Sequence, residues 1–212
     1  MYHDGTVSVA LLPLMKRVSA SRVLRACRFE KSLDFPVSML TGMSTDLGFR
    51  CSCCGQEHDG LPFGYGTVAP AYWNEDLEDS SGNVLGDEHC VIGGEHFFIR
   101  ARLILPIEDS ENDFEWEVWV SLSKSNFDRA TELWTSPERV QEPPYFGWLS
   151  TELPTYESTT LNLKTKLHSQ PVGVRPTVEL EPTDHPLAVE QRTGITLARV
   201  QAIAEQVLHP RR

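Results

Sequence analysis

The strongest constraint on the fold is a pair of neighbouring segments in which apolar and other residues alternate strictly. These are residues 97–105 and 114–122, joined by the polar connection PIEDSEND. Such alternation is typical of β-strands with one buried face, because successive side chains point to opposite sides. We therefore predict an antiparallel hairpin whose core face consists of Phe97, Ile99, Ala101, Leu103, Leu105, Phe114, Trp116, Val118, Val120 and Leu122.

The register of this hairpin follows if its loop closes symmetrically. Leu103 then lies opposite Trp116 on the core face. On the other face, Arg102 lies opposite Glu117, and Arg100 lies opposite Trp119. We interpret these charged residues as a cross-strand ladder of ion-pair and cation–π contacts rather than as a catalytic set.

A second hairpin and two helices complete the predicted elements. Residues 161–168 and 177–181 alternate again, and a symmetric loop pairs Lys166 with Glu179 and Lys164 with Glu181. One helix is predicted after Ser125, with Asp128 in a capping-box position, and a last helix from about Thr196. The fold class is therefore α+β, an antiparallel sheet of hairpins with a few helices packed on one side.

Composition and charge bound the domain organisation. The 212 residues carry a net charge of -11, but residues 1–42 are basic and residues 43–212 are acidic. We predict a peripheral or disordered extension over 1–42 and a single α+β domain over 43–212. The acidic domain argues against nucleic-acid and membrane partners, so we expect a soluble protein with an unknown protein partner, for which a basic surface is the sharper interpretation of the acidity. Without a recognisable export signal, we expect it in the cytoplasm.

A cysteine cluster carries the main chemical signal. The stretch RCSCCGQEH holds Cys51 and Cys54 at C-x-x-C spacing, then Gly55 and His58. A tight turn at this spacing can aim two thiolates at one ion, and zinc prefers such ligands. This predicts a zinc-knuckle-like loop at 51–58, near the start of the domain. Cys53 could replace a neighbour as ligand, and the alternative is a reduced, metal-free cluster.

A fourth ligand must come from elsewhere in the chain. Cys90 is the best candidate, and His89 and His96 beside it are the alternatives. Three thiolates and one imidazole would close the coordination sphere, so we predict a structural zinc rather than a catalytic one. An open zinc in a metal-dependent hydrolase is the alternative, with Asp59, Asp87 or Glu95 as a base. That alternative expects a cleft around His58, Asp59 and His96.

One further constellation is the Asp184, His185 and Glu190 group in EPTDHPLAVEQ. An Asp beside a His can support acid–base chemistry. The same residues also make a turn and a helix start, with Pro186 in the first helical position. We prefer the structural interpretation, and we predict no catalytic residues.

Six blocks in order resemble one bacterial family. They are FRCSCCGQEHDGLPF, CVIGGEHFFIR, WEVWVSLS, PPYFGWLS, LNLKTKLH and ELEPTDHPLAVEQRTGIT. Together they are similar to the uncharacterised proteins grouped as domain of unknown function 2199. The resemblance implies that Cys51, Cys54, His58 and Cys90 are the metal ligands. We predict a non-enzymatic binding or interaction protein; the alternatives are the hydrolase and a toxin-immunity-type protein.

Overall fold

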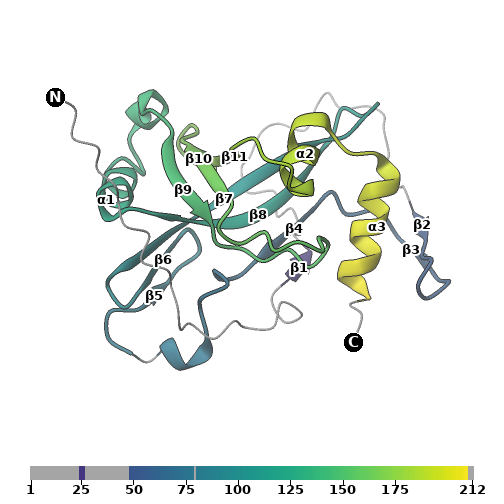
Figure 1. Ribbon diagram of the computed structural model, residues 1–212, viewed down its shortest axis with the longest axis horizontal. Helices are drawn as coiled ribbons and strands as arrows, with labels where there is room; N and C mark the ends of the chain where they lie inside the picture. Colours follow the sequence, from purple (N-terminus) through teal and green to yellow (C-terminus); the bar gives the residue numbers. More distant parts are fainter. Residues whose placement is uncertain (1–23, 27–47, 79, 210–212) are drawn as a thin grey trace, which may run out of the picture.

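The computed structural model describes residues 24–26, 48–78 and 80–209, and shows strands and helices in one α+β arrangement (Figure 1). The strands are β1 (Leu24–Ala26), β2 (Phe49–Arg50), β3 (Glu57–His58), β4 (Gly64–Thr67), β5 (Val84–Leu85), β6 (His89–Ile92), β7 (His96–Pro106), β8 (Asp113–Leu122), β9 (Tyr145–Leu149), β10 (Lys164–His168) and β11 (Thr177–Leu180). The α-helices are α1 (Lys124–Glu132), α2 (Pro186–Thr193) and α3 (Leu197–Leu208), and two short 3-10 helices are η2 (Glu75–Leu77) and η3 (Pro137–Gln141).

The first predicted hairpin is β7 and β8, and its register is confirmed. Leu103 lies opposite Trp116, and Arg102 lies opposite Glu117. All ten residues of the predicted core face are buried, most of them completely. Their burial explains why the register is so well specified, since a slip by one residue would turn this whole face toward solvent.

The second predicted hairpin is β10 and β11, and it too has the expected pairing. Lys166 lies opposite Glu179. Just past the last paired residues of β10 and β11, Lys164 Nζ lies 4.0 Å from Glu181 Oε2. Both lysines are exposed, so these pairs contribute little to stability and mainly keep the outer face polar.

The connections between hairpins were not evident from the sequence. Strand β11 pairs in parallel with β7, and β4 pairs in parallel with β8. Strands β7, β8, β9, β10 and β11 pair in this order, and β11 pairs with β7 again, so these five strands form a closed ring. Within this ring, β9 lies very close to β8 at Gly147. A side chain there would not fit, because a Cβ on residue 147 would lie only 2.5 Å from Val120 Cγ1.

The helices begin at side-chain caps. Ser123, rather than the predicted Ser125, caps α1 by accepting a hydrogen bond from the Asn126 N–H. Thr196 caps α3 as predicted. Helix α2 packs on β7, and buried residues of α2 and α3 complete the main core. The predicted α+β class is thereby confirmed.

One end of the sheet is covered on both faces, which the alternation did not indicate. Phe98 and Trp119, expected on the outer face, are fully buried. They belong to a second hydrophobic cluster, consisting of Ala69, Tyr72, Trp73, Cys90, Ile92, Phe98 and Trp119. The segment that follows β4 packs over this face, so the outward positions of β7 and β8 are polar only farther along the strands.

The charged outer face is an ion-pair network. Arg100 lies opposite Trp119 as predicted, but its guanidinium forms an ion pair with Glu117 at 2.6 Å. The Arg102 guanidinium forms an ion pair with Glu115. Arg175, from the loop before β11, contacts Glu117 as well. These groups hold strands and a loop together, which fits the structural interpretation of the ladder.

The predicted N-terminal extension falls mostly outside the described residues, and so does Cys27. Within it, Leu24–Ala26 forms β1 and pairs with β4, so these three residues join the sheet. None of the helices in the described part of the chain combines the length and the apolar character that crossing a bilayer requires.

Candidate metal centre

The cysteine-rich segment is a short hairpin. Strands β2 and β3 pair antiparallel, with Phe49 opposite His58. Between them, the Cys51 N–H donates to the Gln56 carbonyl, and the Gly55 N–H donates to the Cys51 carbonyl, both at 2.9 Å. Gly55 has φ 70°, a conformation that glycine adopts without strain. The C-x-x-C-G sequence thus forms the tight turn that the spacing predicted.

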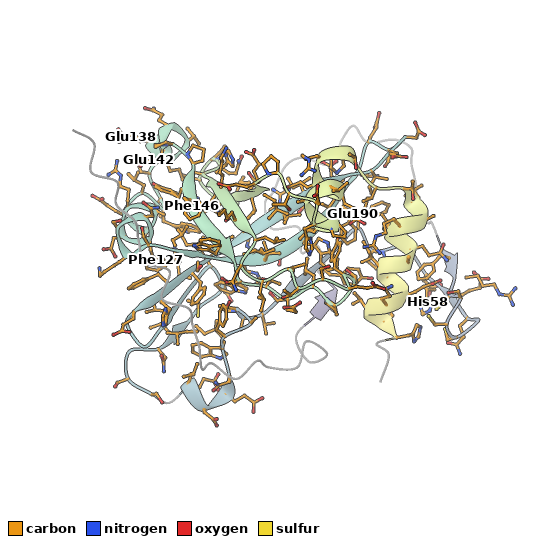
Figure 2. The ribbon with its side chains drawn as sticks, viewed as in Figure 1. His58, Phe127, Glu138, Glu142, Phe146 and Glu190 are labelled. Carbon is orange, nitrogen blue, oxygen red and sulfur yellow. The ribbon has the colours of Figure 1, made fainter. Side chains whose placement is uncertain are left out.

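Four potential ligands meet at this hairpin: Cys51, Cys54, His58 and His209. Their ligand atoms all lie within 4.8 Å of one another. The Cys54 Sγ lies 3.6 Å from His58 Nε2, and the rings of His58 and His209 are 5.8 Å apart. His58 is labelled beside the end of α3 in Figure 2. The cluster is compatible with the predicted knuckle-like loop, and this group could bind a metal ion.

Helix α3 holds the turn in place from the other side. Glu205 accepts hydrogen bonds from the Ser52 N–H at 2.8 Å and from the Ser52 hydroxyl at 2.5 Å. Gln201 donates to the Arg50 carbonyl and to Glu205. Figure 1 shows the β2–β3 hairpin beside α3, at one end of the molecule. His209, one residue beyond the helix, is thereby brought to the cysteines.

The electrostatics of the turn favour anionic groups. Burial alone would raise the pKa of the Cys51 thiol, but hydrogen bonds from the backbone N–H groups of Cys54 and Cys53 and from the Cys54 side chain lower it overall. Hydrogen bonds from Gln201 and Ser52 lower the pKa of Glu205 to about 2. A thiolate is the form of cysteine that binds metals, so the turn is prepared for ligation.

Cys90, predicted as the fourth ligand, is not brought to this group. It lies on β6, fully buried in the second hydrophobic cluster. Burial raises the pKa of its thiol to about 12, so it stays protonated at neutral pH. The physical reason is that β6 lies at the β5–β6–β7 end of the sheet, while the β2–β3 hairpin contacts α3. The fourth residue whose ligand atom lies within 4.8 Å of those of Cys51, Cys54 and His58 is His209.

The alternative ligands are also elsewhere. The His89 ring packs against Trp134 with centroids 4.3 Å apart, and its pKa is lowered mainly by burial. His96 begins β7 and is no part of the ligand group. Cys53 is exposed on the turn and outside the group as well.

His209 was missed because it is near the cysteines only in space. The sequence offers only one weak signal, a histidine that follows the stretch predicted as the last helix. In the structure, His209 Nε2 is buried without a hydrogen-bond partner among the described residues. A buried polar atom in that state calls for an explanation, and a bound ion is one.

The donor set is of the kind that holds a metal ion in tetrahedral coordination. Two thiolates and two imidazoles are a common structural zinc set. With metal–ligand distances of about 2.0–2.3 Å, the ligand atoms of a tetrahedron lie about 3.3–3.8 Å apart. The 3.6 Å between Cys54 Sγ and His58 Nε2 falls within this range.

Two members of the constellation near residue 185, His185 and Glu190, make contacts that hold helices in place. His185 caps α2 by accepting from the Leu187 N–H, and Pro186 is the first helical residue as predicted. Glu190 accepts hydrogen bonds from Tyr156 at 2.5 Å and from Arg199 at 2.7 Å. These contacts connect α2 to α3 and to the loop before β10, and they are of the kind that the structural interpretation expects.

Comparison with known proteins gives one match. No curated protein and no solved structure matches the chain. The sequence profile of the uncharacterized proteins conserved in bacteria called DUF2199 matches residues 50–195, which is well over half of the chain. The match covers Cys51, Cys54 and His58 but ends before α3 and His209. The chain therefore belongs to the DUF2199 family of bacterial proteins.

Proposed function

We propose that Cys51, Cys54, His58 and His209 bind one structural zinc ion. The observation that carries this proposal is the gathering of their four ligand atoms within 4.8 Å. The ion would fasten the cysteine-rich turn to the end of α3, beside the Ser52–Glu205 hydrogen bonds. Two short strands with an exposed turn bury little apolar surface, so a metal supplies the stability that such a hairpin lacks on its own.

We further propose that the protein is a non-enzymatic binding protein. Four protein ligands leave no open position for a substrate or a water, which catalytic zinc sites keep. Asp59 follows His58, but His96, which the hydrolase alternative requires, lies on β7 away from the ligand group. The closed ligand set and the structural use of His185 and Glu190 support a binding role over hydrolysis.

The test is the metal content of the purified full chain, measured by elemental mass spectrometry. Cys54→Ser and His209→Ala each remove one proposed ligand. Cys53→Ser and Cys90→Ser are the matched controls, since each removes a cysteine outside the group. We expect about one zinc per wild-type chain. We expect that zinc to be lost in the two ligand variants and kept in the two controls.

The outcomes separate the competing ligand sets. Loss of zinc in Cys90→Ser with retention in His209→Ala would restore the ligand set implied by the family resemblance and refute ours. A wild-type chain without metal would refute the site altogether. Cobalt substitution gives a second readout, because the intensity of its sulfur-to-metal absorption reports how many thiolates bind. We expect the spectrum of a tetrahedral site with two thiolates.

A further inference from the structure

A cavity of about 560 Å³ lies away from the metal centre, over the second hydrophobic cluster. Its size is typical of pockets that bind small molecules. Three stretches of chain form it: residues 67–71 with 73–76 and Glu78, then Leu85, then residues 151–152. Apolar side chains make up much of the lining: Val68, Ala69, Pro70, Ala71, Trp73 and Leu85.

The walls of this cavity are fixed by the sheet beneath them. The Trp119 indole N–H donates to the Thr67 carbonyl at 3.3 Å, and the Trp119 backbone N–H donates to Thr151 Oγ1 at 2.8 Å. The Ala71 N–H donates to the Ser150 carbonyl at 2.8 Å. Hydrogen bonds thus connect the end of β4 to β8, the loop after β9 to β8, and the loop after β4 to the end of the β9 segment. Because these connections exist within the fold itself, the cavity is preformed. A preformed pocket needs little ordering when a ligand binds.

The charged groups of the lining are all acidic. Glu75, Asp76 and Glu78 are exposed on and beside η2, and Glu152 lies on the opposite loop. Among the described lining residues there is no lysine, arginine or histidine. Glu152 accepts a hydrogen bond from the Thr159 hydroxyl at 2.7 Å, but none of the four carboxylates has an ion pair within the described chain. The cavity therefore favours a positively charged occupant.

Two oxygen atoms of lining residues are unsatisfied. Thr67 is only 5% exposed, and its Oγ1 has no hydrogen-bond partner among the described residues. The same holds for the buried Oδ1 of Asn74, which precedes η2 without capping it. Buried polar atoms are rarely left unpaired in folded proteins. Both oxygens are shielded from the cavity surface, so the apolar walls and the carboxylates at the rim are what select an occupant.

We propose that this cavity binds a small organic cation, an ammonium or guanidinium group attached to an apolar body. The apolar body packs on Trp73 and its neighbours, and the cationic group is attracted by the carboxylates at the rim. This proposal is independent of the zinc site, because the cavity and the Cys/His group share no residue.

The test is a titration of the full-length ¹⁵N-labelled protein with tryptamine and, separately, agmatine, followed by amide NMR shifts. Indole-3-propionate, which has the same ring as tryptamine and the opposite charge, is the ligand control. We expect both cations to shift the amides of Val68, Ala71 and Trp73 with a Kd of about 1 mM or tighter. We expect the anion to leave these amides unchanged.

A charge variant tests the rim directly. The triple variant Glu75→Gln, Asp76→Asn, Glu78→Gln should weaken tryptamine binding at least about threefold. The control triple variant Glu108→Gln, Asp109→Asn, Glu111→Gln makes the same charge change in the β7–β8 loop and should bind as the wild type does. Three results would each overturn the proposal: no shift of these amides by either cation, equal shifts with the anion, or equal affinity in both triple variants.

Discussion

Replacing Glu205 by Gln tests the attachment of the cysteine-rich turn to α3. The two carboxylate oxygens accept separate bonds, Oε1 from the Ser52 N–H and Oε2 from the Ser52 hydroxyl. An amide of the same shape has only one oxygen, so at least one donor then faces an NH₂ group. Hydrogen bonds to a charged group contribute about 1.5–3 kcal/mol, and we expect the free energy of unfolding to fall by that amount. The melting temperature should fall by about 3–12 °C in a chain of this size.

The lowered pKa of Glu205 predicts in which pH range its carboxylate stabilises the folded protein. The pKa of Glu205 is lowered from 4.5 to about 2, because the folded protein stabilises its charged form. The stability that it contributes is therefore fully present above about pH 4.5 and is lost as the pH falls through about 2. The difference between wild type and Glu205→Gln should be largest near neutral pH and should shrink over this acidic range.

Urea unfolding at several pH values measures this difference, with a chelator present so that metal release does not contribute. Glu111→Gln is the matched control, since Glu111 is exposed in the β7–β8 loop, and it should change stability by less than about 0.5 kcal/mol. If Glu205→Gln were as stable as this control, or if its deficit stayed constant from neutral pH to pH 2, the inferred role of the carboxylate would be refuted.

Three further substitutions test other parts of the structure. Cys90→Ser places a hydroxyl in an apolar cluster, so urea unfolding should show a loss of about 1–3 kcal/mol; unchanged stability would contradict the burial of this thiol. Gly147→Ala brings a Cβ to 2.5 Å from Val120 Cγ1, and the same assay should show a loss of at least about 1–3 kcal/mol, whereas wild-type stability would contradict the close β8–β9 approach. Tyr156→Phe removes the hydroxyl that donates to Glu190 and should cost about 1 kcal/mol or more in thermal unfolding, with no loss if that bond is absent.

The local elements of this protein were predictable from the sequence because each depends on neighbours along the chain. Alternation fixed both hairpins, and the Leu103–Trp116 pairing followed from the loop length alone. The turn at Cys51–Gly55 and the cap at Thr196 are likewise short-range features. The same short-range pattern correctly placed three members of the Cys/His group side by side.

The wrong expectations concern contacts between distant segments. Trp119 was assigned to an outer face because alternation gives the side of a strand, not whether another segment covers that side. The loop after β4 covers it, so the residue is buried. The parallel pairing of β11 with β7 was missed for the same reason, since no sequence period records which strand ends lie together.

The sequence by itself determined that Cys51, Cys54 and His58 lie close together, because a tight turn brings side chains at this spacing to one place. Only the tertiary structure decided the fourth member. Cys90 is fixed in the second hydrophobic cluster by β6, while α3 packs against the β2–β3 hairpin and carries His209 to the cysteines. Packing of the last helix, rather than any spacing of residues, completes the candidate site.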